Sequence, residues 1–79
     1  MIQSPTEPRM KESVSNRVFE ARSRRSVTQE DLASAVGVTR QTVIAIEKGN
    51  YTPSVLLAIK LARFFKMSVE ELFVISKHS

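Results

Sequence analysis

The sequence predicts an all-α fold: one compact domain of five short helices, with a helix-turn-helix formed by the second and third. Apolar residues recur at spacings of three and four through five consecutive segments, which is the period of a helix with one buried face. Threonine or serine precedes three of these segments, at the position where a side chain caps a helix. A chain of 79 residues has room for a single core.

The first helix is expected over residues 15–25, where Val18 and Phe19 would be buried. The second and third helices are expected within residues 28–49, with Thr28 and Thr39 as their capping residues. Gly37 separates them, and a glycine in the left-handed conformation can turn two helices to nearly a right angle. The inward side chains are expected to be Leu32, Ala33 and Val36 on the second helix and Val38, Val43 and Ile46 on the third.

The fourth helix is expected over residues 54–66, directly after Pro53, which favours a helix start. Its core-facing residues would be Val55, Ala58, Ile59, Ala62 and Phe65. A second apolar stripe remains, which a small monomer would cover poorly, so we expect a homodimer. That stripe consists of Leu57, Leu61 and Phe64, extended by Val74 and Ile75.

The fifth helix follows Ser68, which can form a capping box with Glu71. Its inward side chains are expected to be Val69, Leu72 and Phe73. We expect three parts: a disordered arm over residues 1–12, the helical domain over residues 13–76, and a frayed tail over residues 77–79. Met10 could serve as an alternative start.

The outer face of the third helix carries the most informative side chains. Arg40, Gln41 and Ala45 lie together on it, with Ile44 and Lys48 beside them. Arginine and glutamine can make paired hydrogen bonds to guanine and adenine edges in the major groove, and alanine can contact a thymine methyl. An ordinary solvated face would more often carry glutamate and lysine. The face therefore favours double-stranded DNA as a partner, although a helical hairpin without a partner is the alternative.

Several motifs accompany this face in order along the chain. Gln29 opens the second helix, TRQTV begins the third, IEKG closes it, and NYTPS and MSVEELF follow. On these motifs, residues 16–73 resemble the lambda-repressor-like (Cro-type, XRE) helix-turn-helix transcriptional regulators. The resemblance implies four or five helices in one compact domain. Two positions depart from it, because Ser26 and Lys66 stand where relatives often carry glycine, and each could cost up to about 1 kcal/mol of left-handed strain.

The resemblance also implies roles for individual residues. Bases would be read by Arg40, Gln41 and Ala45, with Ile44 adjoining. The DNA backbone would be held by Gln29, Thr39, Thr42, Lys48 and Asn50. The alternative for Lys48 and Asn50 is a solvated helix end. Arg22 and Glu47 would form an ion pair between the first and third helices, or else be independent surface charges.

Composition narrows the functional classes. The net charge of +4 and a pI near 10.0 favour polyanionic partners without identifying DNA. No cysteine is present, which excludes disulfides and thiolate metal sites and agrees with a reducing, cytoplasmic setting. We expect no membrane span, because no apolar run approaches about 20 residues. We also expect no enzymatic activity, cofactor, metal or small-molecule substrate, since the one histidine, His78, is next to last and no catalytic constellation is present.

Three function classes follow. The first is a sequence-specific DNA-binding regulator, acting as a repressor that occupies an operator as a dimer on an inverted repeat. The second keeps the DNA-binding fold but adds a protein partner, as in an antitoxin or a restriction-modification controller. The third is a helical protein-interaction module without DNA binding, which would not need Gln29, Lys48 and Asn50 arranged around the reading face.

Overall fold

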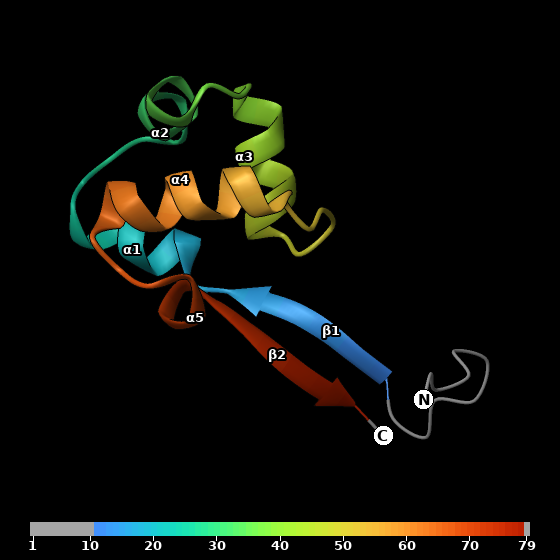
Figure 1. Cartoon of the computed structure of the whole chain (residues 1–79). Helices are drawn as coiled ribbons and strands as arrows, with labels where there is room; N and C mark the ends of the chain where they lie inside the picture. The colour runs from blue at the N-terminus through green and yellow to red at the C-terminus, as the bar shows by residue number, and fades with distance from the viewer. Residues whose placement is uncertain (1–10, 79) are drawn as a thin grey trace.

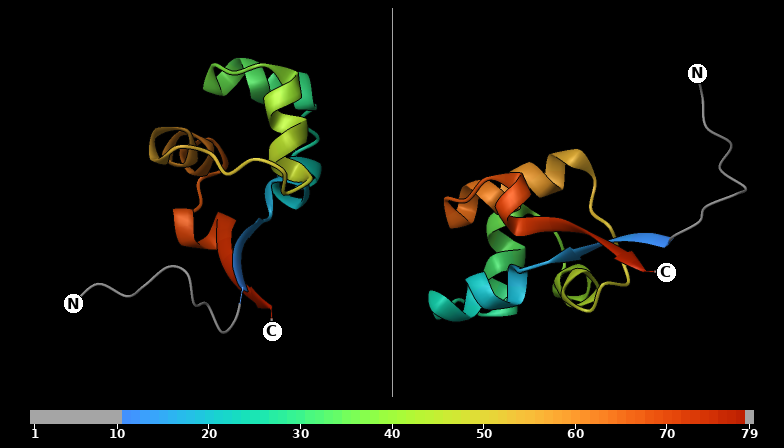
Figure 2. Two further views of the ribbon diagram at one scale, coloured as in Figure 1. Left: turned by 90° about the vertical axis from the view of Figure 1, so that its right-hand side faces the viewer. Right: turned by 90° about the horizontal axis from the view of Figure 1, so that it is seen from below.

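Five helices form one body, from which a two-stranded ribbon extends (Figure 1). The computed structural model describes residues 11–78. The helices are α1 (Val18–Arg24), α2 (Gln29–Val36), α3 (Arg40–Glu47), α4 (Val55–Phe65) and α5 (Val69–Leu72). The strands are β1 (Lys11–Asn16) and β2 (Phe73–His78). Figure 2 shows the ribbon leaving the helices beside α1 and α5, on the side away from α2.

The ribbon corrects the all-α expectation, which is confirmed for the helices only. Strands β1 and β2 pair antiparallel, with Val14 opposite Ile75 and Asn16 opposite Phe73. The ladder continues into the helical body, because the Arg17 N–H donates to the Leu72 carbonyl at 2.9 Å. The two strands lie at opposite ends of the sequence, so local apolar spacing could not reveal their pairing.

The ribbon also changes three expected boundaries. The first helix begins at Val18 rather than at residue 15, because residues 15 and 16 belong to β1. Of the expected arm, residues 1–10 lie outside the described residues, whereas residues 11 and 12 are in β1. Of the expected tail, residue 79 lies outside them, whereas residues 77 and 78 are in β2.

The core draws on all five helices. The expected inward residues of α2 are buried, as are Val43 and Ile46 of α3, while Val38 packs against the core from the turn. Phe19 is a correction: its side chain is 56% exposed, and its ring lies under the Arg22 guanidinium at 5.3 Å. The buried core residues are Val18, Ala21, Leu32, Ala33, Val36, Val43, Ile46, Leu57, Leu61, Ala62, Phe65 and Leu72.

Helix α4 keeps only part of its expected core face, because Ala62 and Phe65 are buried as expected but other members are not. Leu57 and Leu61, assigned to a surface stripe, are buried, whereas Val55 and Ile59 are exposed. The apolar pattern alone cannot decide which face is buried, because the helix VLLAIKLARFF is apolar on most sides. Leu57 and Leu61 occupy the core, and the exposed apolar surface that remains on α4 is Val55, Leu56 and Ile59.

Several helix ends include a residue in the left-handed conformation, and at two of them the residue is not the glycine that relatives often carry. Gly37 ends α2 in the left-handed conformation (φ 79°), as expected, and its N–H donates to the Ala33 carbonyl. Ser26 and Lys66 also have positive φ, at 55° and 58°. Both therefore carry the strain that a glycine would avoid. The end of α4 has additional support, because the Arg25 guanidinium donates to the carbonyls of its last two residues.

No helix within residues 11–78 has the length and hydropathy needed to cross a membrane.

Lys66→Gly should raise the free energy of unfolding by up to about 1 kcal/mol, because glycine adopts the left-handed conformation without a Cβ clash. Urea unfolding followed by circular dichroism measures the change. Lys66→Ala is the matched control, since it removes the same charge and side chain but keeps the Cβ. An equal gain from both variants would show that backbone strain at residue 66 is not the cause.

Candidate nucleic-acid interface

Helix α3 presents its polar residues outward from a fixed start. The Thr39 hydroxyl oxygen accepts from the Thr42 N–H at 3.2 Å, which caps the helix. Val43 and Ile46 are buried on the inner face, and this fixes the rotation of the helix about its axis. Arg40 and Gln41 are exposed on the first turn. Two of the four side chains predicted to meet DNA bases are therefore fully at the surface.

The other predicted site residues divide by exposure. Lys48 and Asn50 are exposed at the end of α3, as is Thr39 at its start. Ile44, Ala45 and Thr42 are half-buried. The hydroxyls of Thr39 and Thr42 are 3.1 Å apart, so one donates to the other and only one hydroxyl hydrogen remains for an outside acceptor.

Two surface hollows flank the exposed start of α3. Arg40 and Gln29 line a hollow of about 530 Å³ together with Arg22. Gln41 and Ala45 line another, of about 330 Å³. The structure thus brings Gln29 beside Arg40, although they come from different helices of the motif.

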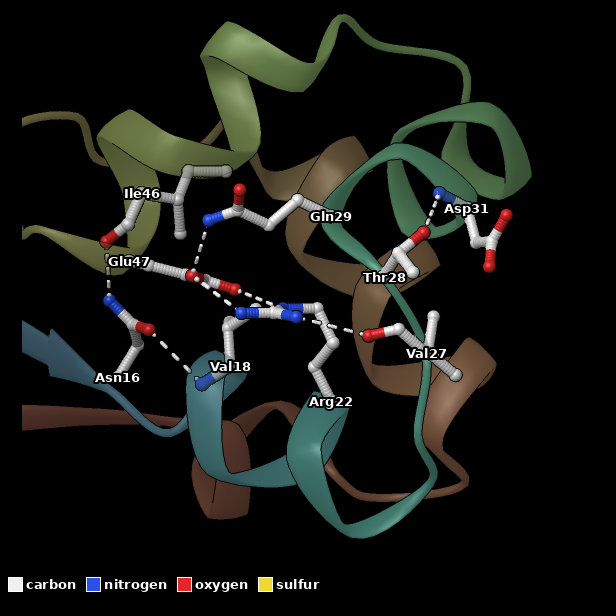
Figure 3. Close-up of polar contacts among 9 residues, drawn as sticks. All are labelled: Asn16, Val18, Arg22, Val27, Thr28, Gln29, Asp31, Ile46 and Glu47. Atoms are coloured by element: carbon white, nitrogen blue, oxygen red, sulfur yellow. Dashed lines mark hydrogen bonds and ion pairs between the residues drawn. The ribbon is translucent and has the colours of Figure 1, made fainter.

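The Glu47 carboxylate joins three helices. It accepts from Arg22 Nε at 2.7 Å and from a terminal Arg22 nitrogen at 3.2 Å, which confirms the predicted ion pair between α1 and α3. Gln29 of α2 donates to the same carboxylate at 3.1 Å. Figure 3 shows Glu47 between these two side chains. The Arg22 and Glu47 side chains are only 14% and 8% exposed, so water screens the pair weakly.

Arg22 extends the network to the turn before α2. Its second terminal nitrogen donates to the Val27 carbonyl at 3.0 Å. The guanidinium therefore connects α1, the Val27 turn and the end of α3. Because a planar guanidinium holds its donors in fixed directions, the network fixes orientation as well as distance.

Gln29 has a structural role that the sequence did not indicate. Its amide nitrogen has two hydrogens, of which one is donated to Glu47. The other remains available for a phosphate. Glu30 and Asp31 lie in the first turn of α2, where their carboxylates offset the positive end of the helix dipole.

Asn16 is a second positioning residue missed in the sequence. Its side-chain oxygen accepts from the Val18 N–H at 3.1 Å, and its side-chain nitrogen donates to the Ile46 carbonyl at 2.8 Å (Figure 3). It thus links the start of α1 to the last turn of α3. An asparagine just before a helix can be recognised in a sequence as a capping residue. Its hydrogen bond to residue 46 could not be predicted, because the two residues are far apart along the chain.

Among the residues that the structure describes, no group of three or more histidine, cysteine or carboxylate side chains is placed to hold a metal ion. The polar side chains of the predicted site are instead amides, hydroxyls, a guanidinium and an ammonium group, which suit phosphate oxygens and base edges.

Glu47→Ala should lower the free energy of unfolding by about 3 kcal/mol, because it leaves the poorly exposed Arg22 guanidinium without its acceptor. Thermal and urea unfolding provide the measurement. Glu20→Ala removes an exposed carboxylate from α1 and should cost less than about 1 kcal/mol. Equally small losses for the two variants would mean that the Glu47 network does not stabilise the fold.

Comparisons with known proteins identify the family of this chain. Residues 18–72 match the helix-turn-helix family HTH_3. The HTH-type transcriptional regulator YgzD of Bacillus subtilis is 55% identical over 58 residues, which are 73% of this chain and 88% of YgzD. The HTH-type transcriptional regulator MJ0272 of Methanocaldococcus jannaschii is 51% identical over 59 residues, which are 75% of this chain and 89% of that protein.

A solved structure is similar as well. The restriction-modification controller protein C.AhdI from Aeromonas hydrophila superposes with a TM-score of 0.65 at 31% identity, covering 70% of this chain and 83% of the controller. The fold, the motif and the relatives lead to the same conclusion. The chain belongs to the XRE family of helix-turn-helix transcriptional regulators, which are DNA-binding proteins.

Proposed function

We propose that this protein is a sequence-specific regulator that inserts α3 into the major groove of double-stranded DNA. The observation that carries the proposal is the exposure of Arg40 and Gln41 on the first turn of a helix held by Glu47. An α-helix fits the major groove, and arginine and glutamine are the side chains best suited to paired hydrogen bonds with guanine and adenine. A helix that is already held in position adds little conformational entropy cost on binding.

The site residues divide into two roles in this proposal. One group reads bases, and the other holds phosphates and so fixes how the helix lies in the groove. The base-reading residues are Arg40, Gln41, Ala45 and Ile44. The backbone-binding residues are Gln29, Thr39, Thr42, Lys48 and Asn50.

Regulation by occupancy follows from this arrangement. A protein bound over an operator excludes other proteins from the same DNA, so the proposed activity is repression in the cytoplasm. Control of restriction-modification genes is the second candidate, because C.AhdI is a controller of that kind and is similar to this chain. An antitoxin with a toxin partner would use the same interface. The genes beside this one distinguish these candidates.

The proposed active form is a homodimer on an inverted repeat. Leu57 and Leu61 of the expected dimer surface are buried and cannot contribute to it, although Ile75 of the same surface is exposed. Val55, Leu56 and Ile59 form an exposed apolar strip on α4 instead. A twofold dimer through this strip would place two α3 helices on half-sites separated by about one helical turn, roughly 34 Å.

Gln41→Ala should cost about 1–3 kcal/mol on a selected operator and relax the preference at one base pair, because it removes a paired contact. Lys48→Ala should weaken binding to all sequences alike and reduce the salt slope by about 1, because it removes a phosphate contact. Selection from random duplexes supplies the operator, and fluorescence anisotropy at several salt concentrations measures both effects. Unchanged binding by both variants would overturn the assignment of this face.

The wild-type protein should be a dimer at micromolar concentration by size-exclusion chromatography with light scattering, and Leu56→Glu should make it a monomer. Ile75→Glu is the matched control, since Ile75 is 66% exposed and Leu56 is 64% exposed, but Ile75 lies on the ribbon. Dissociation by Ile75→Glu alone would place the interface on the ribbon. A wild-type monomer at high micromolar concentration would contradict the dimer.

A further inference from the structure

The hollow beside α3 includes a residue that the proposed site leaves out. Gln41, Thr42 and Ala45 form one wall, and Asn50 and Tyr51 form the other. The first three share a strip of α3, because they lie at positions i, i+1 and i+4. The hollow is therefore continuous with the surface proposed to enter the major groove.

The end of α3 explains why Tyr51 lies there. Gly49 has a φ of 78°, which reverses the chain direction. The Asn50 N–H then donates to the Ala45 carbonyl at 2.9 Å, and the Gly49 N–H donates to the Ile46 carbonyl at 2.9 Å. These bonds form a Schellman-type helix end, which returns the chain toward the last turns of the helix. Tyr51, in the segment between α3 and α4, thereby lines the same hollow as Ala45.

The environment of Tyr51 is not that of a core residue. Its side chain is 46% exposed and lies outside the buried cluster. Its hydroxyl makes no hydrogen bond within residues 11–78, so it is not needed to hold the turn. It is the only tyrosine of the chain. The fold thus leaves half of an aromatic ring open at the rim of the hollow.

The residues that line the hollow favour a ligand that has an apolar group beside a polar one. The Ala45 methyl and the Tyr51 ring are apolar, while Gln41 and Asn50 place amides at the edge. In the major groove, the apolar group that distinguishes one base from the others is the C5 methyl of thymine. The hollow, at about 330 Å³, admits such a methyl together with the edge of its pyrimidine ring. Gln41 is matched to adenine, so an A·T pair would supply both features.

We propose that Tyr51 is a specificity-determining residue, which with Ala45 forms a pocket for the C5 methyl of a thymine at or next to the base pair read by Gln41. This inference rests on the proposed function. It extends base readout beyond α3 to the turn that follows it. A 5-methylcytosine would present the same methyl, but Gln41 selects the thymine of an A·T pair.

The test uses the full chain and a selected operator in which each thymine is replaced in turn by deoxyuridine, which lacks only the methyl. For the wild type, each half-site should contain one thymine whose replacement matters. Replacing that single thymine should weaken binding about four-fold, as expected for loss of one buried methyl. Tyr51→Ala should bind the thymine and deoxyuridine duplexes equally, whereas Tyr51→Phe should keep the four-fold ratio. Thermal unfolding verifies that the variants are folded.

The outcomes separate this inference from the proposed function. If Gln41→Ala weakens binding but Tyr51→Ala keeps the thymine-to-deoxyuridine ratio, the pocket is wrong and the groove-binding helix stands. If no replacement by deoxyuridine matters, or if only a 5-methylcytosine in place of cytosine strengthens binding, the thymine assignment is overturned. If the wild type binds no duplex, both proposals fail.

Discussion

The Glu47 carboxylate is the polar contact on which the placement of α3 depends. It receives two hydrogen bonds from Arg22 and one from Gln29, so the end of α3 is tied to both α1 and α2. Apolar packing alone is not directional, and Val43 and Ile46 would allow the helix to slide or tilt on the core. A weakly exposed carboxylate with three donors permits one arrangement, because any displacement leaves a buried charge incompletely bonded.

The remaining constraints act at the two ends of the same helix. Gly37 and the Thr39 cap set where α3 begins, and Gly49 sets where the chain turns away from it. Asn16 adds a bond to the last turn from the base of the ribbon. A helix of eight residues has little stability of its own, so these end contacts and the core determine its direction. The outward side chains can then serve recognition without also holding the fold.

The sequence allowed prediction of those features that have local signatures. Gly37, the Thr39 cap and the Ser68–Glu71 capping box are short-range patterns, and the structure confirms them. The Arg22–Glu47 pair came from the family resemblance and is also confirmed. The ribbon was missed because Asn16 and Phe73 meet only in three dimensions. The face of α4 was misassigned because that helix is apolar on most sides, so size and fit, rather than spacing, decide which residues are buried.

The most direct test of the account is a nitrogen-15 nuclear magnetic resonance titration of the protein with a selected duplex. If α3 is the element that enters the groove, the largest amide shift changes will fall in residues 39–51 and at Gln29, while the ribbon remains unchanged. Changes centred on β1 and β2, with the amides of Arg40 and Gln41 unmoved, would contradict the account.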